Sequence, residues 1–238
     1  MEVASLYREP EAEDERPSFG ALEFHDVFRI YRSGPVETVA LRGLDLRVET
    51  GEMVALFGPS GSGKSTALQL AAGLDEPSAG DVRALGRSLG RLEEEELAGY
   101  RARDVAIVFQ SGNLWPQLSA GENVRLALKL AGRKGGRSTP GQALDAFGLG
   151  GRTGQRAGSL SGGEQQRVAI AAAAAREARL VFADEPTAEL DEQNEEVVLE
   201  ALRHLREEFG STVVLVTHSS RVADAADRVL ELRDGKLV

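Results

Sequence analysis

Apolar residues follow two different patterns along the chain, and each pattern predicts β-strands of a different kind. Between residues 22 and 48 apolar and polar positions alternate, as at Leu22 and Phe24, and Ser33-Gly34-Pro35 interrupts the run. Alternation with a period of two is typical of strands that bury one face. The interruption predicts a turn between two such strands.

Residues 53–57, 180–183 and 212–216 are instead almost continuously apolar. Short runs without alternation favour strands of a parallel sheet that is buried on both faces. Glycines and a helical pattern follow the first run at once, so an α/β core is expected. Near the end of the chain, the runs 229–232 and 236–238 flank Asp234-Gly235, which predicts a β-hairpin.

Between about residues 111 and 160 the composition changes to helix formers and glycine, with a glycine-rich loop at 132–137. This change favours a helical insertion in the α/β core. Residues 1–18 hold six acidic and two basic residues and few large apolar ones. Such a segment cannot bury enough apolar surface to pack, so we expect a disordered acidic tail there.

The 238 residues carry 28 Lys and Arg against 38 Asp and Glu, a formal net charge of −10. A surface that neutralises nucleic-acid phosphates needs a clustered basic excess, so no nucleic-acid partner is expected. Cysteine is absent, which excludes a disulfide framework, a thiolate metal site and a cysteine nucleophile. The longest purely apolar run, 168–175, is far shorter than the roughly 20 residues of a membrane span, and the acidic N-terminus is unlike a signal peptide. We therefore expect a chain that is soluble on its own and suits a reducing cytoplasm.

Residues 58–66 match the pattern G-x-x-x-x-G-K-[ST] of a phosphate-binding loop between a strand and a helix. Glycines let successive backbone N–H groups turn towards phosphate oxygens, and the following helix adds its positive N-terminal end. The Lys64 ammonium would reach the β- and γ-phosphates, and the Ser65 hydroxyl would ligate Mg²⁺. The expected nucleotide-binding residues of this loop are Gly58, Ser60, Gly61, Ser62, Gly63, Lys64, Ser65 and Thr66.

Two carboxylates, Asp184 and Glu185, follow the apolar run 180–183. At the carboxyl end of a parallel strand, beside a phosphate loop, a carboxylate is placed to contact Mg²⁺, and we assign that role to Asp184. Glu185 would accept a proton from the attacking water or orient it. Many strands end in solvated acids without a function, so this prediction depends on the phosphate loop.

Residues 160–167 indicate a second anion site, because they precede a long alanine-rich helical segment. Ser161 and Glu164 have the spacing of a capping box. Gly162 and Gly163 leave backbone N–H groups uncovered at the start of the helix. An ordinary capped helix explains the spacing but not the paired glycines. The site would serve a second ligand or close over a nucleotide held by another copy of the chain, and the spacing does not choose between them.

Together these residues resemble the ATP-binding cassette (ABC) ATPases over about residues 22–238. Residues 160–167 resemble the family signature, 58–65 its Walker A loop and 180–185 its Walker B strand. Four further positions match family motifs: the Q-loop residue Gln110, the switch histidine His218, the adenine-stacking aromatic Tyr31, and Leu190-Asp191 at the end of the D-loop.

The resemblance implies an α/β fold: a P-loop NTPase core with a mostly parallel sheet, an N-terminal antiparallel β subdomain and an inserted α-helical subdomain at about 111–160. One nucleotide-binding domain would span residues 19–238. ATP and Mg²⁺ are the implied cofactors. The implied catalytic residues are Glu185, His218 and Lys64, and those around the metal are Ser65, Gln110 and Asp184.

The family also implies that two copies associate head to tail, each signature closing over the ATP of the other, which would explain the second anion site. Ser161 and Gly163, with Gly162 between them, would contact the γ-phosphate in trans and His218 would contact it in cis. Gln110 would link Mg²⁺ to the partner interface. The implied further partner is an integral membrane permease that holds the ATPase, as a cytoplasmic peripheral protein, on the inner face of the cell membrane.

Within the family, residues 40–43, 113–116 and 168–170 resemble the lipoprotein-release and macrolide-export branch, although amino-acid importers share much of this pattern. Permeases of that branch have few membrane helices and large extracytoplasmic domains. The expected function is ATP hydrolysis that drives export or the extrusion of lipoproteins or lipids. Three positions depart from the family pattern: Ala188-Glu189, Ala172 and Ser219. None removes a phosphate, metal or water-orienting group, so the departures concern coupling between subunits.

Other functions are open at this point. An ATPase of a mechanotransmission complex that controls an extracytoplasmic enzyme would share all these features. A DNA-repair or translation-factor ABC protein would carry long coiled-coil insertions or tandem cassettes, and the sequence has neither. A module without catalysis would lack groups such as Glu185 and Lys64. Trp115, between Leu114 and Pro116, either docks a permease helix or belongs to the core.

Overall fold

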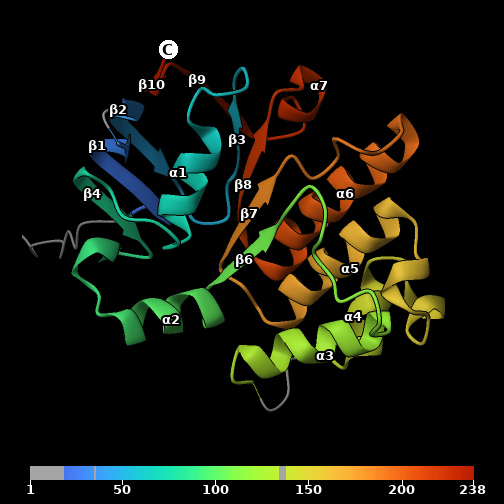
Figure 1. The fold of residues 1–238 in the computed structure, drawn as a ribbon. Helices are drawn as coiled ribbons and strands as arrows, with labels where there is room; N and C mark the ends of the chain where they lie inside the picture. Colours follow the sequence, from blue (N-terminus) through green and yellow to red (C-terminus); the bar gives the residue numbers. More distant parts are fainter. Residues whose placement is uncertain (1–18, 35, 134–137) are drawn as a thin grey trace, which may run out of the picture.

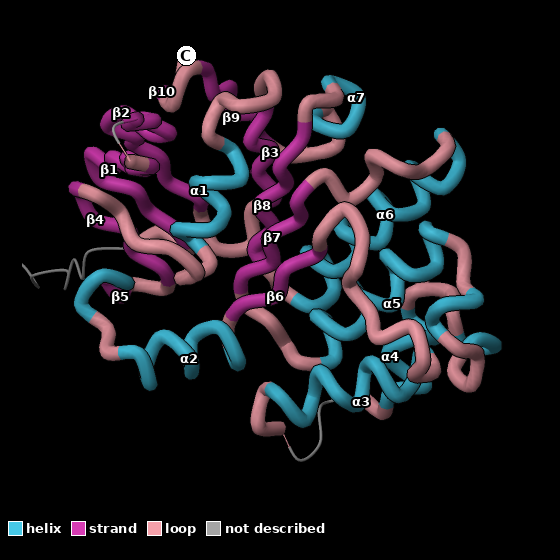
Figure 2. The backbone as a smooth tube through the Cα atoms, viewed as in Figure 1, coloured by secondary structure: helices cyan, strands magenta, loops and turns pink. Residues whose placement is uncertain are grey.

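Two β-sheets, one antiparallel and one mostly parallel, form the frame of the molecule, and helices pack around them (Figures 1 and 2). The computed structural model describes residues 19–34, 36–133 and 138–238. The acidic tail expected at 1–18, Pro35 of the predicted turn and residues 134–137 of the predicted glycine-rich loop lie outside the described residues.

The antiparallel sheet has the strand order β2-β1-β4-β5. Its strands are β1 (Leu22–Ser33), β2 (Val36–Val48), β4 (Ala79–Ala84) and β5 (Arg87–Ser88). Leu22 of β1 lies opposite Val48 of β2, and the two strands pair antiparallel, which confirms the prediction from the alternating pattern. Strand β4 has only one large apolar residue, Val82, and β5 has none, so the hydrophobic pattern does not predict them.

The second sheet has the order β10-β9-β3-β8-β7-β6. Its strands are β3 (Met53–Phe57), β6 (Val105–Val108), β7 (Leu180–Asp184), β8 (Thr212–Thr217), β9 (Arg228–Arg233) and β10 (Lys236–Leu237). Neighbours pair parallel except β9 and β10, which form the predicted hairpin. Asp234 and Gly235 turn this hairpin with φ of 48° and 79°, and two positive φ values are typical of a type I′ turn.

The helices are α1 (Lys64–Ala71), α2 (Glu94–Arg103), α3 (Ala120–Leu130), α4 (Pro140–Ala146), α5 (Gly162–Ala175), α6 (Glu192–Phe209) and α7 (Ser220–Ala223). Short 3₁₀ turns are η1 (Leu89–Arg91), η2 (Gly150–Arg152) and η3 (Ala157–Ser159). Helices α3 and α4 lie in the stretch expected to be a helical insertion. Capping boxes open α3 and α5, and that of α5 confirms the Ser161–Glu164 spacing.

Alternate residues of the parallel strands point into two separate hydrophobic clusters. Val214 and Val216 of β8 pack with α1 and the antiparallel sheet, whereas Val213 and Leu215 pack with α5 and α6. The parallel sheet is therefore buried on both faces, with α1 on one side and α3 to α6 on the other (Figure 1). Among the described residues, no helix is long and apolar enough to cross a membrane.

Candidate functional site

The loop between β3 and α1 begins at the carboxyl edge of the parallel sheet and depends on glycine at two close approaches. A Cβ atom on Gly58 would lie 2.2 Å from the Leu232 carbonyl oxygen, and one on Gly63 would lie 2.5 Å from that of Ala40. Gly63 also has a φ of 104°. Ser60 and Gly61 lie in the loop, and Ser65 and Thr66 lie in the first turn of α1.

Lys64 is buried and fills this loop with its side chain. The ammonium Nζ donates hydrogen bonds to the carbonyl oxygens of Gly58, at 2.7 Å, and Pro59, at 2.9 Å. Burial lowers the pKa of the ammonium, and the carboxylates of Glu185 and Asp184 oppose that shift. The Ser62 hydroxyl is buried beside it with no hydrogen-bond partner in the described part of the chain. A buried ammonium and an unsatisfied hydroxyl in a glycine-lined loop fit an incoming phosphate group.

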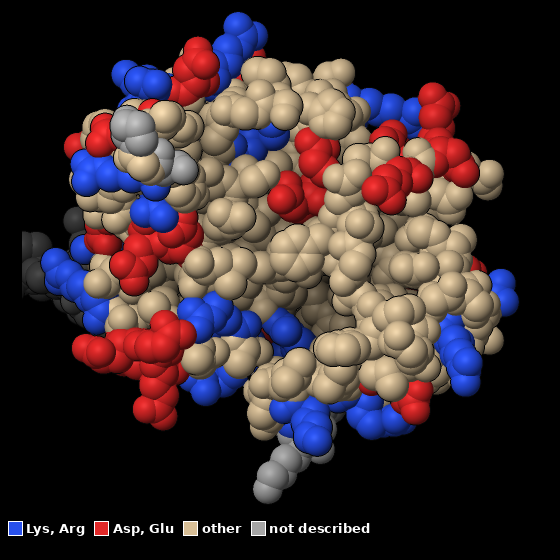
Figure 3. Space-filling model, in the orientation of Figure 1, with Lys and Arg blue, Asp and Glu red and all other residues tan. Residues whose placement is uncertain are grey.

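Asp184, the last residue of β7, lies across from the start of α1. Burial and the charge of Glu185 raise the pKa of its carboxyl group, whereas a hydrogen bond from the Ser65 hydroxyl and the charge of Lys64 lower it. Magnesium ions prefer one or two carboxylates together with hydroxyl, water and phosphate oxygens. The Ser65–Asp184 pair supplies protein ligands of that kind, so the residues fit Mg²⁺. In Figure 3 acidic side chains gather where β7 ends, and basic atoms lie recessed next to them towards α1.

Glu185 follows Asp184 in a left-handed conformation with a φ of 47°. Its Oε1 lies 2.7 Å from Nδ1 of His218, and its Oε2 accepts a hydrogen bond from the Thr217 hydroxyl at 3.3 Å. Both partners stand at the carboxyl end of β8, the strand next to β7. Glu185 is thus held at the sheet edge, beside the phosphate loop, with His218 exposed in front of it.

Gln110 and Gln166 connect the loop after β6 to other parts of the site. The Gln110 amide donates a hydrogen bond of 3.1 Å to the Glu189 carboxylate. The Gln166 amide, buried on α5, donates to the carbonyl oxygens of Phe109 and Gln110 at 2.9 and 2.7 Å. Its oxygen accepts a 2.8 Å bond from Asn113. The loop that carries Gln110 is therefore tied to the helix that follows the predicted second anion site.

The start of α5 does not meet the phosphate loop in this chain, because α1 and α5 pack on opposite faces of the parallel sheet. The Ser161 hydroxyl accepts from the Glu164 N–H at 3.3 Å, and Glu164 accepts from the Ser161 N–H at 2.9 Å. The paired glycines allow close packing: a Cβ on Gly162 would lie 3.1 Å from Leu190, and one on Gly163 would lie 3.0 Å from the Asn194 oxygen. Packing therefore explains part of the glycine requirement without a ligand.

Comparison with known proteins decides the family. The family model described as "ABC transporter" matches residues 41–188, which include the phosphate loop, Gln110, residues 160–167 and the β7 carboxylates. This chain belongs to the ABC transporter family. Members of this family bind and hydrolyse ATP, so the chain is an ATPase with a P-loop α/β fold, as the sequence predicts.

The relatives of this ABC cassette include two kinds of curated protein. The lipoprotein-releasing system ATP-binding protein LolD of Anaeromyxobacter dehalogenans is 45% identical, covering 91% of this chain and 92% of that protein. The macrolide export ATP-binding/permease protein MacB of Syntrophobacter fumaroxidans is 42% identical, covering 90% of this chain. The chain spans only 30% of the length of that MacB protein. These names confirm the resemblance to the lipoprotein-release and macrolide-export branch.

Solved ABC cassettes share the fold over nearly the whole chain. The ATP-binding cassette MJ0796, solved as a dimer in a post-hydrolysis state bound to ADP and Pi, has a TM-score of 0.80 and 37% sequence identity. The match covers 91% of this chain and 96% of that one. An ABC cassette from Clostridium perfringens, cbiO1, matches with a TM-score of 0.79 at 25% identity.

Two of the residues expected to bind nucleotide in this cassette have other contacts in the structure. The Tyr31 hydroxyl donates to Asp75 at 2.9 Å, and the Arg29 guanidinium lies 4.5 Å from the centre of the Tyr31 ring. Asp191 accepts the Asn194 N–H at 2.9 Å and is the N-cap of α6. These contacts do not test the expected roles, which stay predictions.

Trp115 of the cassette is 63% exposed, so the alternative that it belongs to the core is wrong. It borders a groove of about 160 Å³, the α3–α5 groove, lined by Ile107, Trp115, Leu130, Ala169, Ala172 and Arg176 with their neighbours. Ala172, one of the departures from the family pattern, lines this groove. Ser219, another departure, is the N-cap of α7.

Sequence reasoning missed Thr217 and Gln166 in this cassette. Thr217 precedes His218 in the last position of a strand and binds Glu185. Gln166 is 4% exposed and adjoins an alanine-rich apolar stretch, and a buried amide in such a place signals a required hydrogen-bond partner.

Proposed function

We propose that this chain works as a head-to-tail pair of ATPase subunits that drives an integral membrane permease of the lipoprotein-release or macrolide-export type. The observation that supports the pair is the separation of the two anion-binding elements. Lys64, Asp184 and Glu185 gather at one edge of the sheet, while Ser161–Gly163 lie on the far side of the sheet. A second copy could bring its own Ser161 to this site, and the similar cassette MJ0796 was solved as a dimer.

The site residues perform separate tasks in the proposed reaction. Lys64 exchanges its bonds to the loop carbonyls for bonds to the β- and γ-phosphates. Ser65, Asp184 and Gln110 would hold Mg²⁺, which when bound would neutralise charge on the phosphate oxygens. Glu185 accepts the proton of the attacking water, and its 2.7 Å contact with His218 Nδ1 orients the carboxylate. His218, which is exposed, contacts the γ-phosphate from the same subunit. Tyr31 stacks on the adenine, and Asp191 lies at the subunit seam.

The α3–α5 groove is the proposed docking site for a short helix of the permease. It is lined mainly by apolar side chains, and Trp115 and Leu130 at its rim are 63% and 67% exposed. Exposed aromatic residues of this kind anchor protein interfaces. Docking would place the ATPase on the inner face of the cell membrane through the permease. The names of the relatives refer to lipoprotein release and macrolide export, which favours extrusion over import. The alternative of a mechanotransmission ATPase receives no support from those names, and we do not propose it.

Pairs of inactive variants test the head-to-tail arrangement. Lys64→Ala disables the phosphate loop, and Ser161→Arg blocks the signature, so each variant alone is expected to lose ATP hydrolysis. A mixture forms heterodimers in which one site carries both defects and the other carries none. ATPase activity should therefore return on mixing, up to about a quarter of wild type for random pairing and independent sites. No recovery at a concentration where heterodimers are detected by mass would exclude assembly in trans.

The catalytic role and the docking role have their own tests. Glu185→Gln should trap an ATP-bound dimer in size-exclusion chromatography, with Lys64→Ala as the control that stays monomeric. Unchanged turnover of Glu185→Gln would refute the proton-acceptor role. Trp115→Ala should leave the ATPase activity of the isolated chain intact and lower its association with the co-purified permease. Wild-type permease association and stimulation by Trp115→Ala would exclude docking at this groove.

A further inference from the structure

Arg176, at the edge of the α3–α5 groove, is a half-buried cation with no carboxylate partner among the described residues. It follows the last residue of α5, and its Nη2 donates a hydrogen bond to the Val105 carbonyl oxygen of β6. Its Nε is buried and has no hydrogen-bond partner among the described residues. Of the side chains that line the groove, Arg176 alone carries a charge within the described ranges.

No described carboxylate compensates the charge of Arg176. Burial lowers the pKa of the guanidinium most, and the positive charge of Arg133 lowers it further. Arg133 itself is paired with Glu177. A guanidinium stays protonated in proteins, so Arg176 remains a cation whose charge is partly removed from water. Such a charge is costly unless an anion meets it.

Two other arginines of the chain have the carboxylate partner that Arg176 lacks among the described residues. The Arg206 guanidinium lies 2.5 Å from Asp227, and that of Arg228 lies 2.7 Å from Glu52, so each has a carboxylate partner within the chain. No ion pair of this kind involves Arg176 in the part of the chain that the structure describes. The chain carries 38 acidic residues in all, and the described ones leave this arginine without a pair.

The shape of the groove suits a closely packed helix. Ala169, Ala172 and Ala173 of α5 line it, and their small side chains let a second backbone approach α5. Figure 3 shows the surface hollowed between β6 and α3, with basic atoms beside the hollow. A segment seated there would cover Trp115 and bring one of its own side chains to Arg176.

We propose that the permease segment docked in the α3–α5 groove carries an aspartate or glutamate among apolar residues, and that its carboxylate pairs with Arg176. This inference rests on the proposed function, because it names the chemistry of the docked segment. The carboxylate accepts hydrogen bonds from the guanidinium, including one from Nε, which has no partner in the part of the chain that the structure describes. The pair thereby selects a permease that has an acid at the matching position.

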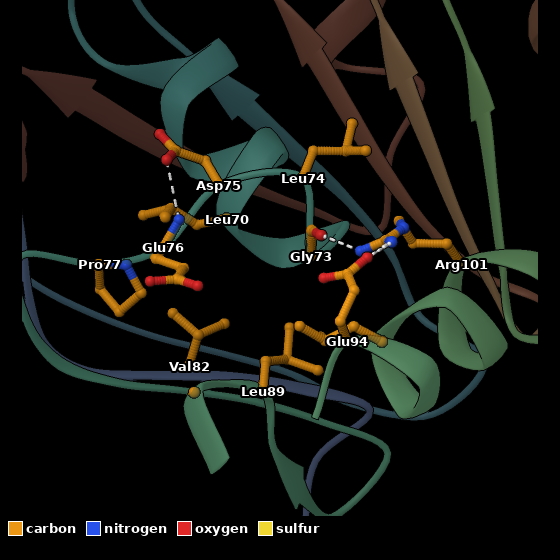
Figure 4. A pocket seen from close by; sticks show the side chains of 12 residues that line it. Leu70, Gly73, Leu74, Asp75, Glu76, Pro77, Val82, Leu89, Glu94 and Arg101 are labelled. Carbon is orange, nitrogen blue, oxygen red and sulfur yellow. Dashed lines mark hydrogen bonds and ion pairs between the residues drawn. The ribbon is translucent and has the colours of Figure 1, made fainter. Parts of the chain in front are cut away.

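A larger cavity of about 370 Å³ does not point to a ligand in the same way (Figure 4). It lies between the end of α1, β4 and α2, where Arg101 donates to the Gly73 carbonyl oxygen at 2.8 Å and pairs with Glu94. The arginine of this cavity therefore has a carboxylate partner, Glu94, whereas no described carboxylate pairs with Arg176.

A zero-length cross-link tests the proposal on the intact complex. The tagged chain is produced together with its permease, the complex is isolated in detergent, and Arg176→Lys supplies an amine at that position. A carbodiimide joins an amine only to a carboxyl group in contact with it. We expect an amide bond between position 176 and one Asp or Glu of the permease, located by peptide mass spectrometry. Arg221→Lys is the matched control, which should link only to Glu192 or Glu195 of its own chain.

Charge exchange provides the second measurement. Arg176→Glu should weaken permease association at least tenfold, and Arg176→Met should weaken it less, while both keep the ATPase activity of the isolated chain. Replacing the cross-linked acid of the permease by arginine should restore association with Arg176→Glu. If the Arg176→Lys complex forms without a permease cross-link, or Arg176→Met binds like wild type, the carboxylate pairing is wrong and docking still stands. If the wild-type chain forms no complex, the proposed function fails as well.

Discussion

The contact between Gln110 and Glu189 should weaken nucleotide binding. We therefore expect Glu189→Ala to bind the nucleotide more tightly. Glu189 is one of the residues that depart from the family pattern, and its carboxylate accepts the Gln110 amide at 3.1 Å. In the proposed function Gln110 turns to Mg²⁺, so this hydrogen bond must break first. The conformation that binds Mg²⁺-ATP is then only a fraction of the population, and the apparent Kd equals the intrinsic Kd divided by that fraction.

The size of the effect follows from the exposure of this hydrogen bond. A solvent-exposed side-chain hydrogen bond contributes about 0.5–1 kcal/mol net, at the lower end of the usual range. Such a contribution leaves about 15–30% of molecules with Gln110 released. Glu189→Ala should therefore lower the Kd for Mg²⁺-ATP about three- to sixfold. Glu189→Gln keeps an oxygen that can accept the bond, so its Kd should lie closer to wild type.

Calorimetric titration of the isolated chain with ATP, with and without Mg²⁺, measures this effect. The difference should be confined to the titration with Mg²⁺, because Gln110 acts there. Glu200→Ala on α6 is the control, since it removes one exposed acid elsewhere on the chain. A Kd for Glu189→Ala equal to or weaker than wild type, or the same gain without Mg²⁺, would refute the reasoning.

Three further changes have expected outcomes. Gly63→Ala places a Cβ 2.5 Å from the Ala40 carbonyl oxygen at a φ of 104°, so nucleotide binding should be lost and Tm should fall by roughly 2–10 °C in calorimetry. Gln166→Ala leaves two carbonyl oxygens without their donor, which should cost about 1–3 kcal/mol in urea unfolding. The pKa of Asp184 is raised in the fold, so the native state holds its proton longer than the unfolded chain, and wild-type stability falls as pH rises through that range. Without Mg²⁺, Asp184→Asn should therefore gain in Tm relative to wild type as pH rises above about 4.

Each of these changes has a matched comparison. Gly132→Ala also places an alanine at a positive φ, 69°, but with no atom within 4 Å of the new Cβ, so a Tm loss equal to that of Gly63→Ala would contradict the clash. The Gln165 side chain makes one hydrogen bond to the described residues, to the Leu160 carbonyl oxygen, and Gln165→Ala should cost less than Gln166→Ala. A Tm difference between Asp184→Asn and wild type that does not change with pH would show that charge is not its cause.

The sequence predicted most of this site because its motifs are local. The phosphate loop and the start of α5 each consist of consecutive residues whose backbone geometry depends on glycine or on a cap. The end of β7 is a short apolar run followed directly by two carboxylates. The contacts of Gln166 and Thr217 join residues far apart in the chain or on neighbouring strands, so no spacing reveals them. The spacing of apolar residues does not reveal β4, β5 and α2 either, because these elements carry few large apolar residues and depend on neighbouring elements for their burial.

Helix α5 has the proposed permease contact at one end and the proposed partner contact at the other. Ser161 caps its first turn, and Arg176 follows its last residue. The 14 residues between them form a rod of about 21 Å. A tilt of about 5° imposed at Arg176 would displace Ser161 by about 2 Å, as follows from that length. A hydrogen bond to a phosphate oxygen is lost over a displacement smaller than about 2 Å. A permease that tilts α5 could therefore open or close the nucleotide site of the partner subunit through this one helix.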